Sequence, residues 1–344
     1  MTDSGAANGG GGPAKVVRLP VQRPGPGASR AEIEALDELR EALDELGREI
    51  RVRLPGTGAA FSPMPGPLDL FALFDELRAR LGHIGMRECS GEIDEFGMEF
   101  DLVERLRPLQ DFLAQKYWRI EVRGAEFVPV SGPALYIVNR SGLLPYDGWI
   151  LAHLVASIAG EGRRPRFMVE EELIALPFLQ PALVRSGGVL ACRENAERLL
   201  ARGDSLTVFP EGMRGASKTF DQRYELQGFG HYALLEAALD AGVPVIPVGV
   251  VGGEEAQPML FRSYLMAWLL GLPFLPVTPT FPLLGPVGLL PLPSRWGVGF
   301  GAPLASAELD QADGQRPGGV MGVLRGRVEE LVRVGRDLRP SPWR

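Results

Sequence analysis

Apolar residues follow two different patterns along this chain, and the change between them separates a core domain from the region before it. From residue 118 onward, short apolar runs predict strands, and the amphipathic segments between them predict helices. The predicted strands are 118–122, 134–138, 167–169, 205–209 and 244–251, and the predicted helices are 149–158, 172–178, 194–201, 229–241 and 320–334. Strands that are apolar on both faces and alternate with helices are typical of an α/β fold, with a mostly parallel or mixed sheet flanked by helices. We expect such a domain over residues 117–337.

The region before this domain, 29–116, is expected to be helical. Ser29 and Glu32 have the spacing of a capping box, and apolar residues then recur at steps of three and four as far as Ile50. This stripe predicts a helix that docks on the main domain or on a second copy of the chain, so helix 30–52 is a candidate for self-association. Its flanking charge is mostly acidic, which disfavours contact with anionic lipid.

Two more helices are expected in this region, at 68–81 and 99–117. A linker rich in proline and glycine, 54–67, precedes the first of them, and Pro108 is expected to kink or divide the second. Residues 1–28 are rich in glycine and proline with few apolar residues, which predicts a disordered tail.

The segment from Pro258 to Pro293 is apolar, rich in proline, and carries Arg262 as its one charged residue. The prolines at 273, 276, 279 and 282 exclude a regular helix through its centre. Two interpretations fit this composition. The segment either dips into a membrane or binds lipid, or it is a long buried loop.

Charge and cysteine content narrow the class of protein. The net charge is −7 and the sequence pI is about 5.3, which argues against a nucleic-acid-binding protein. Two cysteines, Cys89 and Cys192, do not suggest a disulfide scaffold and suit a reducing compartment. The first thirty residues lack the apolar core of a signal peptide, and no uninterrupted apolar stretch is long enough to span a bilayer. We expect a cytoplasmic protein that is peripheral on the inner membrane surface.

Three polar turns follow predicted strands. The first holds Asn139, Arg140, Ser141 and Asp147, the second holds Glu211, Gly212 and Arg214, and the third is 252–255. Turns at the carboxyl ends of strands in α/β sheets commonly carry the chemistry, so the three are expected to converge on one cleft.

A stretch within the second turn imitates a phosphate-binding loop. Gly212 to Thr219 fits the spacing of a P-loop, but Ser217 stands where the second glycine belongs, and no helical pattern starts at Lys218. This departure argues against nucleotide binding. The chain also lacks the Gly-x-Ser-x-Gly elbow of many serine hydrolases.

The polar turns and their flanks, in this order, resemble the glycerolipid (lysophospholipid) acyltransferase family, including 1-acylglycerol-3-phosphate acyltransferases. The most specific short match is Phe-Pro-Glu-Gly at 209–212. The similarity extends over 92–303 and includes the motifs at 117–124, 145–148, 194–196, 226–227, 229–230 and 243–252. It implies a glycerol-3-phosphate acyltransferase-like fold. It also implies transfer of a fatty acyl group from acyl-CoA or acyl carrier protein to a lysophospholipid or glycerolipid at a membrane, with no metal or other cofactor.

The resemblance also implies roles for particular residues. Asp147 matches the carboxylate that orients the general base. Glu211 and Gly212 match the lining of the acceptor site, and Arg214 would face phosphate, because a guanidinium suits bidentate binding of oxyanions. Asn139 and Ser141 are expected to bind substrate beside them.

This chain departs from the family at the position of the catalytic histidine, which is Arg140. A guanidinium has a pKa above about 12 and cannot accept the proton of an acceptor hydroxyl at neutral pH. We expect Arg140 to form an ion pair with Asp147 that holds the turn.

None of the three histidines is a strong replacement for the missing base. His153 is expected to pack between helices and His83 to lie at a helix end, while His231 is the least unfavourable substitute base. Cys192 is expected to pack in the core.

Two functions remain open from the sequence. One is an acyltransferase whose activity is impaired because the general base is missing. The other is a non-catalytic, membrane-associated protein of this family that binds acyl lipid or regulates its metabolism.

Overall fold

The computed structural model describes residues 92–160, 163–176, 179–264, 267, 274–304, 317–339 and 341. The predicted tail 1–28, the helices at 30–52 and 68–81, the linker 54–67, His83 and Cys89 lie outside the described residues.

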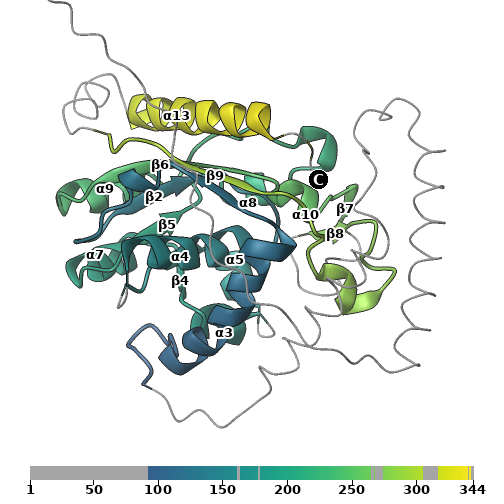
Figure 1. The fold of residues 1–344 in the computed structure, drawn as a ribbon, viewed down its shortest axis with the longest axis horizontal. Helices are drawn as coiled ribbons and strands as arrows, with labels where there is room; N and C mark the ends of the chain where they lie inside the picture. Colours follow the sequence, from purple (N-terminus) through teal and green to yellow (C-terminus); the bar gives the residue numbers. More distant parts are fainter. Residues whose placement is uncertain are drawn as a thin grey trace, which may run out of the picture.

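A seven-stranded mixed sheet forms the centre of the molecule (Figure 1). Its strands are β1 (Glu121–Arg123), β2 (Leu135–Val138), β3 (Arg166–Val169), β4 (Gly188–Leu190), β5 (Leu206–Val208), β6 (Val245–Val251) and β9 (Gly297–Phe300). They lie in the order β1-β9-β6-β2-β5-β3-β4. The five adjacent strands β6, β2, β5, β3 and β4 are parallel to one another. Strand β9 pairs antiparallel with β6, and β1 pairs parallel with β9. The predicted mostly parallel or mixed α/β sheet is therefore confirmed.

Helices cover both faces of this sheet, as its apolar strands require. The bounds are α3 (Phe100–Phe112), α4 (Tyr146–Ala159), α5 (Glu171–Ile174), α6 (Gln180–Arg185), α7 (Arg193–Ala201), α8 (Gly212–Ala216), α9 (Tyr232–Asp240), α10 (Gly253–Ala256) and α13 (Pro317–Leu338). Single turns are η1 (Leu113–Tyr117), η2 (Ala125–Phe127), η3 (Phe220–Gln222) and η4 (Gly285–Leu289). Helices α3 and α4 bury their apolar side chains with Tyr136, Val138 and Val248 on one face of the sheet. Helices α7, α9 and α13 pack with Leu135, Ile137 and Val208 on the other.

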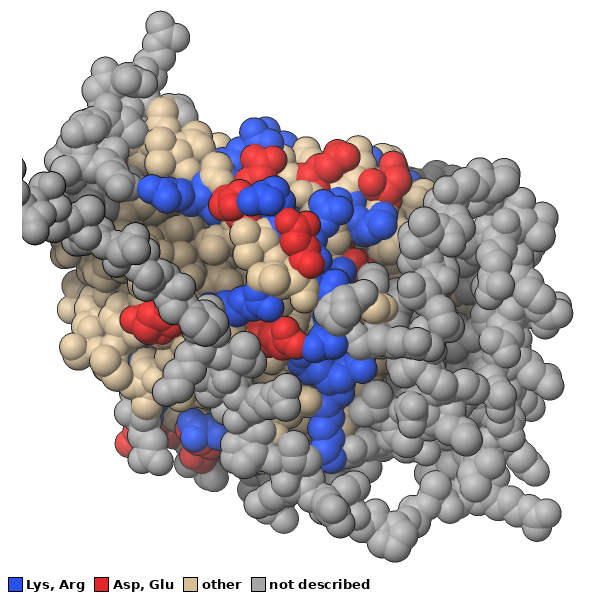
Figure 2. All heavy atoms as spheres, turned by 45° about the horizontal axis from the view of Figure 1, so that its top comes forward, with Lys and Arg blue, Asp and Glu red and all other residues tan. Residues whose placement is uncertain are grey.

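The outer face of α13 is charged and locally balanced. Arg333 lies within ion-pair distance of Glu330 and Asp337, at 2.6 and 3.3 Å. Figure 2, which brings the top of the molecule forward, shows blue and red side chains interleaved across this upper face.

Several predicted boundaries were wrong in instructive ways. Helix α3 contains Pro108 and continues into the π-helical turn η1, so the helix predicted at 99–117 is present but is not divided at Pro108. The helix predicted at 172–178 ends as α5 at Ile174, and α6 follows it. Strands β4 and β9, with three and four residues, were missed because runs this short carry almost no periodic signal.

The described part of the proline-rich segment 258–293 packs at one end of the sheet (Figure 1). It contains a small two-stranded sheet of β7 (Phe261–Ser263) and β8 (Leu275–Val277), followed by η4. Met259, Phe274 and Leu275 are buried, whereas Phe261, Tyr264 and Leu283 are 56%, 63% and 63% exposed. The described part of the segment is thus partly buried, and its predicted contact with a membrane or lipid stays a prediction. Among the described helices, none combines the length and hydropathy needed to cross a bilayer.

Candidate active site

The three polar turns lie side by side because their strands do. Strands β6, β2 and β5 are parallel neighbours, so their carboxyl ends reach the same edge of the sheet. The first turn, 139–147, thus lies between the second, which begins at Phe209, and the third, which begins at Gly252. A fourth strand, β3, ends beside them and is followed by Glu170. The predicted convergence of the turns is confirmed by the contacts below.

Arg140 is fully buried, and its guanidinium faces carboxylates. Its Nη1 donates to Asp147 Oδ1 at 3.0 Å, and its Nη2 donates to the carbonyl of Leu143 at 3.0 Å and lies 3.8 Å from Glu170 Oε2. The guanidinium also lies over the Phe209 ring, 4.8 Å from its centre. The expected ion pair with Asp147 is thus present, and Glu170 is a second partner.

Asp147 holds the first turn together by accepting four hydrogen bonds through its carboxylate. Besides Arg140, Oδ1 accepts from the amide of Gly148 at 2.9 Å. Oδ2 accepts from both the amide and the hydroxyl of Ser141, each at 3.0 Å. A carboxylate offers about four lone pairs, so four donors saturate it. Asp147 therefore has no lone pair left for a further hydrogen-bond donor while these contacts persist.

Glu211 connects the first and second turns. Its Oε1 accepts from the backbone amide of Arg140 at 2.8 Å, and its Oε2 accepts from the amide of Gln227 at 2.8 Å. Lys218 Nζ lies 3.4 Å from the same Oε2. With 1% exposure, Glu211 lies behind the site and fixes the backbone that lines it.

Lys218 connects the second turn to the third. Its Nζ lies 2.7 Å from Glu254 Oε1, and the other oxygen of Glu254 accepts from the amide of Tyr224 at 3.0 Å. Burial raises the pKa of Glu254 to about 7, although the charge of Lys218 acts in the opposite direction. Burial alone lowers the pKa of Lys218, but the carboxylates of Glu254 and Glu211 outweigh it and the pKa is raised.

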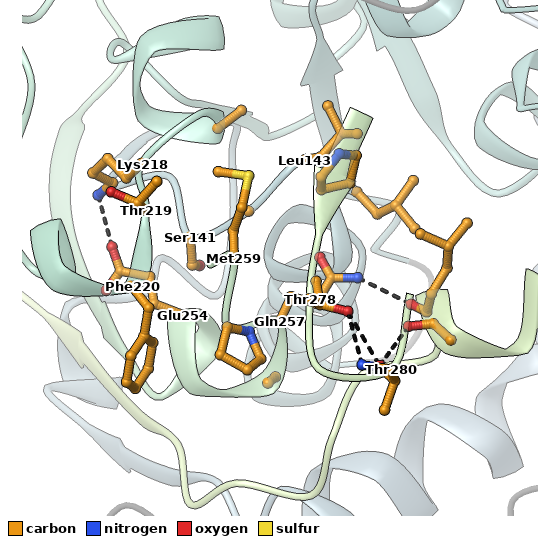
Figure 3. A pocket seen from close by; sticks show the side chains of 18 of the residues that line it. Ser141, Leu143, Lys218, Thr219, Phe220, Glu254, Gln257, Met259, Thr278 and Thr280 are labelled. Atoms are coloured by element: carbon orange, nitrogen blue, oxygen red, sulfur yellow. Dashed lines mark hydrogen bonds and ion pairs between the residues drawn. The ribbon is translucent and has the colours of Figure 1, made fainter. Parts of the chain in front are cut away.

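These residues border a small pocket, here called the polar pocket, with a volume of about 30 Å³. Figure 3 shows Lys218 paired with Glu254 on one side, and Thr278 and Thr280 on another. Its other polar lining residues include Ser141, Thr219 and Gln257. A Cβ on Gly253 would come within 2.4 Å of Ser141 Oγ, so the third turn approaches the first at a distance that glycine permits.

The third turn is anchored from the far end of the chain. Arg339, just beyond α13, donates to Glu255 Oε1 at 2.8 Å and to the Tyr224 hydroxyl at 3.0 Å. That hydroxyl accepts from the amide of Gly252 at 3.1 Å and donates to the other Glu255 oxygen. The C-terminal helix thus holds the turn that supplies Glu254.

Of the residues predicted to bind substrate, Ser141 lines the polar pocket, whereas Asn139, Glu211, Gly212 and Arg214 are not among its described lining residues. Asn139 is fully buried and exchanges two hydrogen bonds with Val250 on β6, at 2.9 and 2.7 Å, which fixes the start of the turn. Arg214 is exposed, and its Nη2 donates to the carbonyl of Gly228 at 2.9 Å. Their roles in binding stay predictions.

The described histidines also have clear environments. His153 Nε2 lies 2.9 Å from Asp111 Oδ1 and connects α4 to α3, which fits the predicted packing role. His231 is exposed at the start of α9, and its Nε2 lies 3.0 Å from where a Cβ on Gly212 would be. Neither is among the described residues that line the polar pocket. Cys192 is half-buried and immediately precedes α7.

An apolar groove of about 320 Å³ adjoins this pocket. Its walls come from α3, α4, α6 and the loop after η4, and include Leu109, Trp149 and Leu183. Leu144 and Leu290 line both the groove and the polar pocket. A long apolar ligand in the groove would therefore end beside the first turn.

Sequence reasoning did not assign site roles to Glu170, Lys218 or Gln257. Glu170 follows a predicted strand directly and could have been found by the rule that identified the other turns. Lys218 was considered only as part of a broken P-loop. Nothing in the local pattern around Gln257 or Thr280 marks them, because α10, β8 and η4 bring them to the site.

Comparison with known proteins agrees with this geometry. The family model described as Acyltransferase matches residues 119–251, which include all three strands that carry the polar turns. An uncharacterized protein of Mycobacterium leprae is 40% identical over 298 residues, covering 84% of this chain and 81% of its own length. One from Mycobacterium tuberculosis is 41% identical over 226 residues, and the match covers 65% of this chain and 63% of that protein.

More distant similarities involve lipid enzymes. The human protein named "DGAT1/2-independent enzyme synthesizing storage lipids" is 29% identical over 167 residues, which cover 47% of this chain and 50% of that protein. Among solved structures, the 1-acyl-sn-glycerophosphate acyltransferase PlsC of Thermotoga maritima aligns with a TM-score of 0.46 and 15% identity, over 80% of this chain and 95% of that one. On the family match and the mycobacterial relatives, this chain belongs to the acyltransferase family.

Proposed function

We propose that this protein binds a fatty acyl thioester and a glycerolipid acceptor at the turn 139–147 and transfers the acyl group slowly between them. The observation that carries this proposal is the junction of the apolar groove with the polar pocket at Leu144 and Leu290. An acyl chain gains about 0.8 kcal/mol for each methylene group that it buries, so the groove supplies affinity while the pocket receives a hydroxyl.

The reaction needs one proton to move. The acceptor oxygen attacks the thioester carbonyl, the new C–O bond forms, the C–S bond breaks, and the hydroxyl proton ends on the departing thiol. The donor would be acyl-CoA or acyl carrier protein, as the family resemblance implies.

The turn lacks the group that would accept this proton during attack. The guanidinium of Arg140 carries no lone pair for it, and the four donors around Asp147 occupy that carboxylate. Loss of a general base costs about 10²–10⁴-fold in rate. The same contacts favour a second candidate function, a non-catalytic protein that binds acyl lipid and acts as a regulator.

Filling the apolar groove is expected to abolish acyl-chain binding without disturbing the turn. Ala182 is exposed on α6 and lines the groove, so Ala182→Trp would occupy the space of the chain. We expect the affinity for a fluorescent fatty acid, measured by titration, to fall at least about tenfold, which corresponds to two buried methylene groups. Ala201→Trp, at an exposed position on α7, is the matched control. Equal affinity in both variants would place the acyl chain elsewhere.

Contact with a membrane would be made by the segment 258–293. Its exposed apolar side chains, Phe261, Tyr264 and Leu283, are supplied by one small subdomain at the end of the sheet where the turns lie. We propose that this subdomain touches the inner membrane surface and lets lipid enter the groove.

Vesicle flotation tests this contact. The double variant Phe261→Ser and Leu283→Ser is expected to lose most of its binding to vesicles, since each such side chain contributes about 1.5–3 kcal/mol when buried. Ile93→Ser with Val130→Ser removes two side chains that are 58% and 75% exposed on other parts of the molecule. If the control pair loses as much binding as the test pair, the subdomain has no special part in membrane contact.

A further inference from the structure

The charges around the polar pocket limit which acceptor it can receive. Lys218 is the cation that lines the described pocket, and it is already paired with Glu254 at 2.7 Å and Glu211 at 3.4 Å. Its side chain is 3% exposed. A ligand anion that approached this ammonium group would also approach the two carboxylates that already neutralise it.

The second cation at the turns, Arg140, is committed in the same way. It is fully buried and lies within ion-pair distance of Asp147 and Glu170. Lys218 and Arg140 together face four carboxylates, and these six groups carry a net charge of −2 when all of them are ionised. A phosphate group brought into this environment meets repulsion in addition to its own desolvation cost.

Arginines near the second turn do not line the described pocket. Arg214 is exposed and donates to the carbonyl of Gly228, and Arg262 Nη1 lies 3.5 Å from Ser217 Oγ. The role in phosphate binding that the resemblance implies for Arg214 stays a prediction, and this arginine is not among the described residues that line the polar pocket.

Neutral hydrogen-bonding groups are, in contrast, available. Ser141 Oγ donates its own proton to Asp147 Oδ2, so its lone pairs can accept a hydrogen bond from an incoming O–H group. Thr219 and Gln257 add further polar atoms to the lining. The volume of about 30 Å³ holds one or two waters, which is enough space for a hydroxyl group.

We propose that the acyl acceptor is an uncharged lipid alcohol of the mono- or diacylglycerol class, whose hydroxyl enters the polar pocket beside Ser141. This assignment rests on the proposed function and specifies its acceptor. The carboxylates beside both cations disfavour a lipid phosphate monoester such as lysophosphatidate at this pocket.

Competition binding tests the acceptor without requiring turnover. The full chain is titrated in mixed micelles with a fluorescent monoacylglycerol, which is then displaced by 1-oleoylglycerol or by 1-oleoylglycerol 3-phosphate. The titration is run at about pH 8, above the raised pKa of Glu254, so that this carboxyl is mostly ionised. We expect 1-oleoylglycerol to displace half of the probe at a concentration at least about tenfold lower than the concentration of 1-oleoylglycerol 3-phosphate that does so.

Charge variants separate the pocket's electrostatics from lipid shape. Glu254→Gln frees Lys218 from its nearer partner, so the affinity for the phosphate competitor, relative to the affinity of the same variant for 1-oleoylglycerol, is expected to rise at least about fivefold. The double variant Lys218→Gln with Glu254→Gln removes the cation as well, so it is expected to show no gain in affinity for the phosphate competitor. This variant is also used if Glu254→Gln alone does not fold. Glu126→Gln, at an exposed carboxylate, is the matched control.

The failures are distinguishable. If the phosphate lipid displaces the probe as well as or better than 1-oleoylglycerol from the native protein, the acceptor assignment is wrong and the proposed function stands. If neither lipid displaces the probe, and the variant Arg140→His acylates neither of them, both the acceptor assignment and the proposed function are wrong.

Discussion

Replacing Arg140 with histidine is expected to raise the rate of acyl transfer by about 10²-fold or more, which is the effect of restoring a general base. Asp147 is held next to this position, because its Oδ2 accepts a hydrogen bond from the amide of Ser141, the residue after Arg140. The carboxylate therefore remains close to a shorter side chain at 140 and can orient an imidazole. The measurement is transfer from acyl-CoA to 1-oleoylglycerol under conditions of excess donor.

A glutamine at the same position is the matched control. Arg140→Gln removes the same buried cation from Asp147 and Glu170 but supplies no proton acceptor at neutral pH. Any gain from relaxed packing or altered charge would appear in both variants. The base interpretation fails if the histidine variant turns over no faster than the native chain and the glutamine variant.

Removing Asp147 is expected to destabilise the protein by about 3–5 kcal/mol, because it leaves the buried guanidinium of Arg140 without its nearest counter-charge. Asp147→Ala also leaves the amide and hydroxyl of Ser141 without an acceptor. Free energies of unfolding from denaturant titration measure this loss.

The control for this change is Asp101→Ala, at an exposed carboxylate in the first turn of α3, where a loss below about 1 kcal/mol is expected. A loss of that small size for Asp147→Ala would mean that Glu170 alone compensates Arg140. The turn would then depend less on the ion pair than its geometry implies.

The strand-turn pattern predicted the architecture of the site well. Apolar runs located β2, β5 and β6, and the rule that chemistry follows parallel strands placed Asp147, Glu211 and the third turn at one edge of the sheet. The opposite charges of Arg140 and Asp147 in a single turn predicted their ion pair. These inferences depended on local composition and on a general property of parallel sheets, both of which are legible in a sequence.

The protein groups that Glu211 and Glu254 contact could not be predicted in the same way. Glu211 was expected to meet substrate, but it accepts from the amides of Arg140 and Gln227. The pairing of Lys218 with Glu254 depends on how two loops from non-adjacent strands approach, which no residue spacing records. The polar pocket could therefore not be predicted from the sequence, because it depends on the tertiary contacts that bring α10 and η4 beside the first turn.

Arg339 contacts the third turn, although the two are synthesised at different times. A ribosome makes the third turn, which holds Glu255, more than eighty residues before it makes Arg339. Until that arginine emerges, Glu255 and Tyr224 lack the guanidinium that joins them. The pocket beside Glu254 thus lacks this anchor until residue 339 has been made, whereas the described residues that line the acyl groove all precede residue 292.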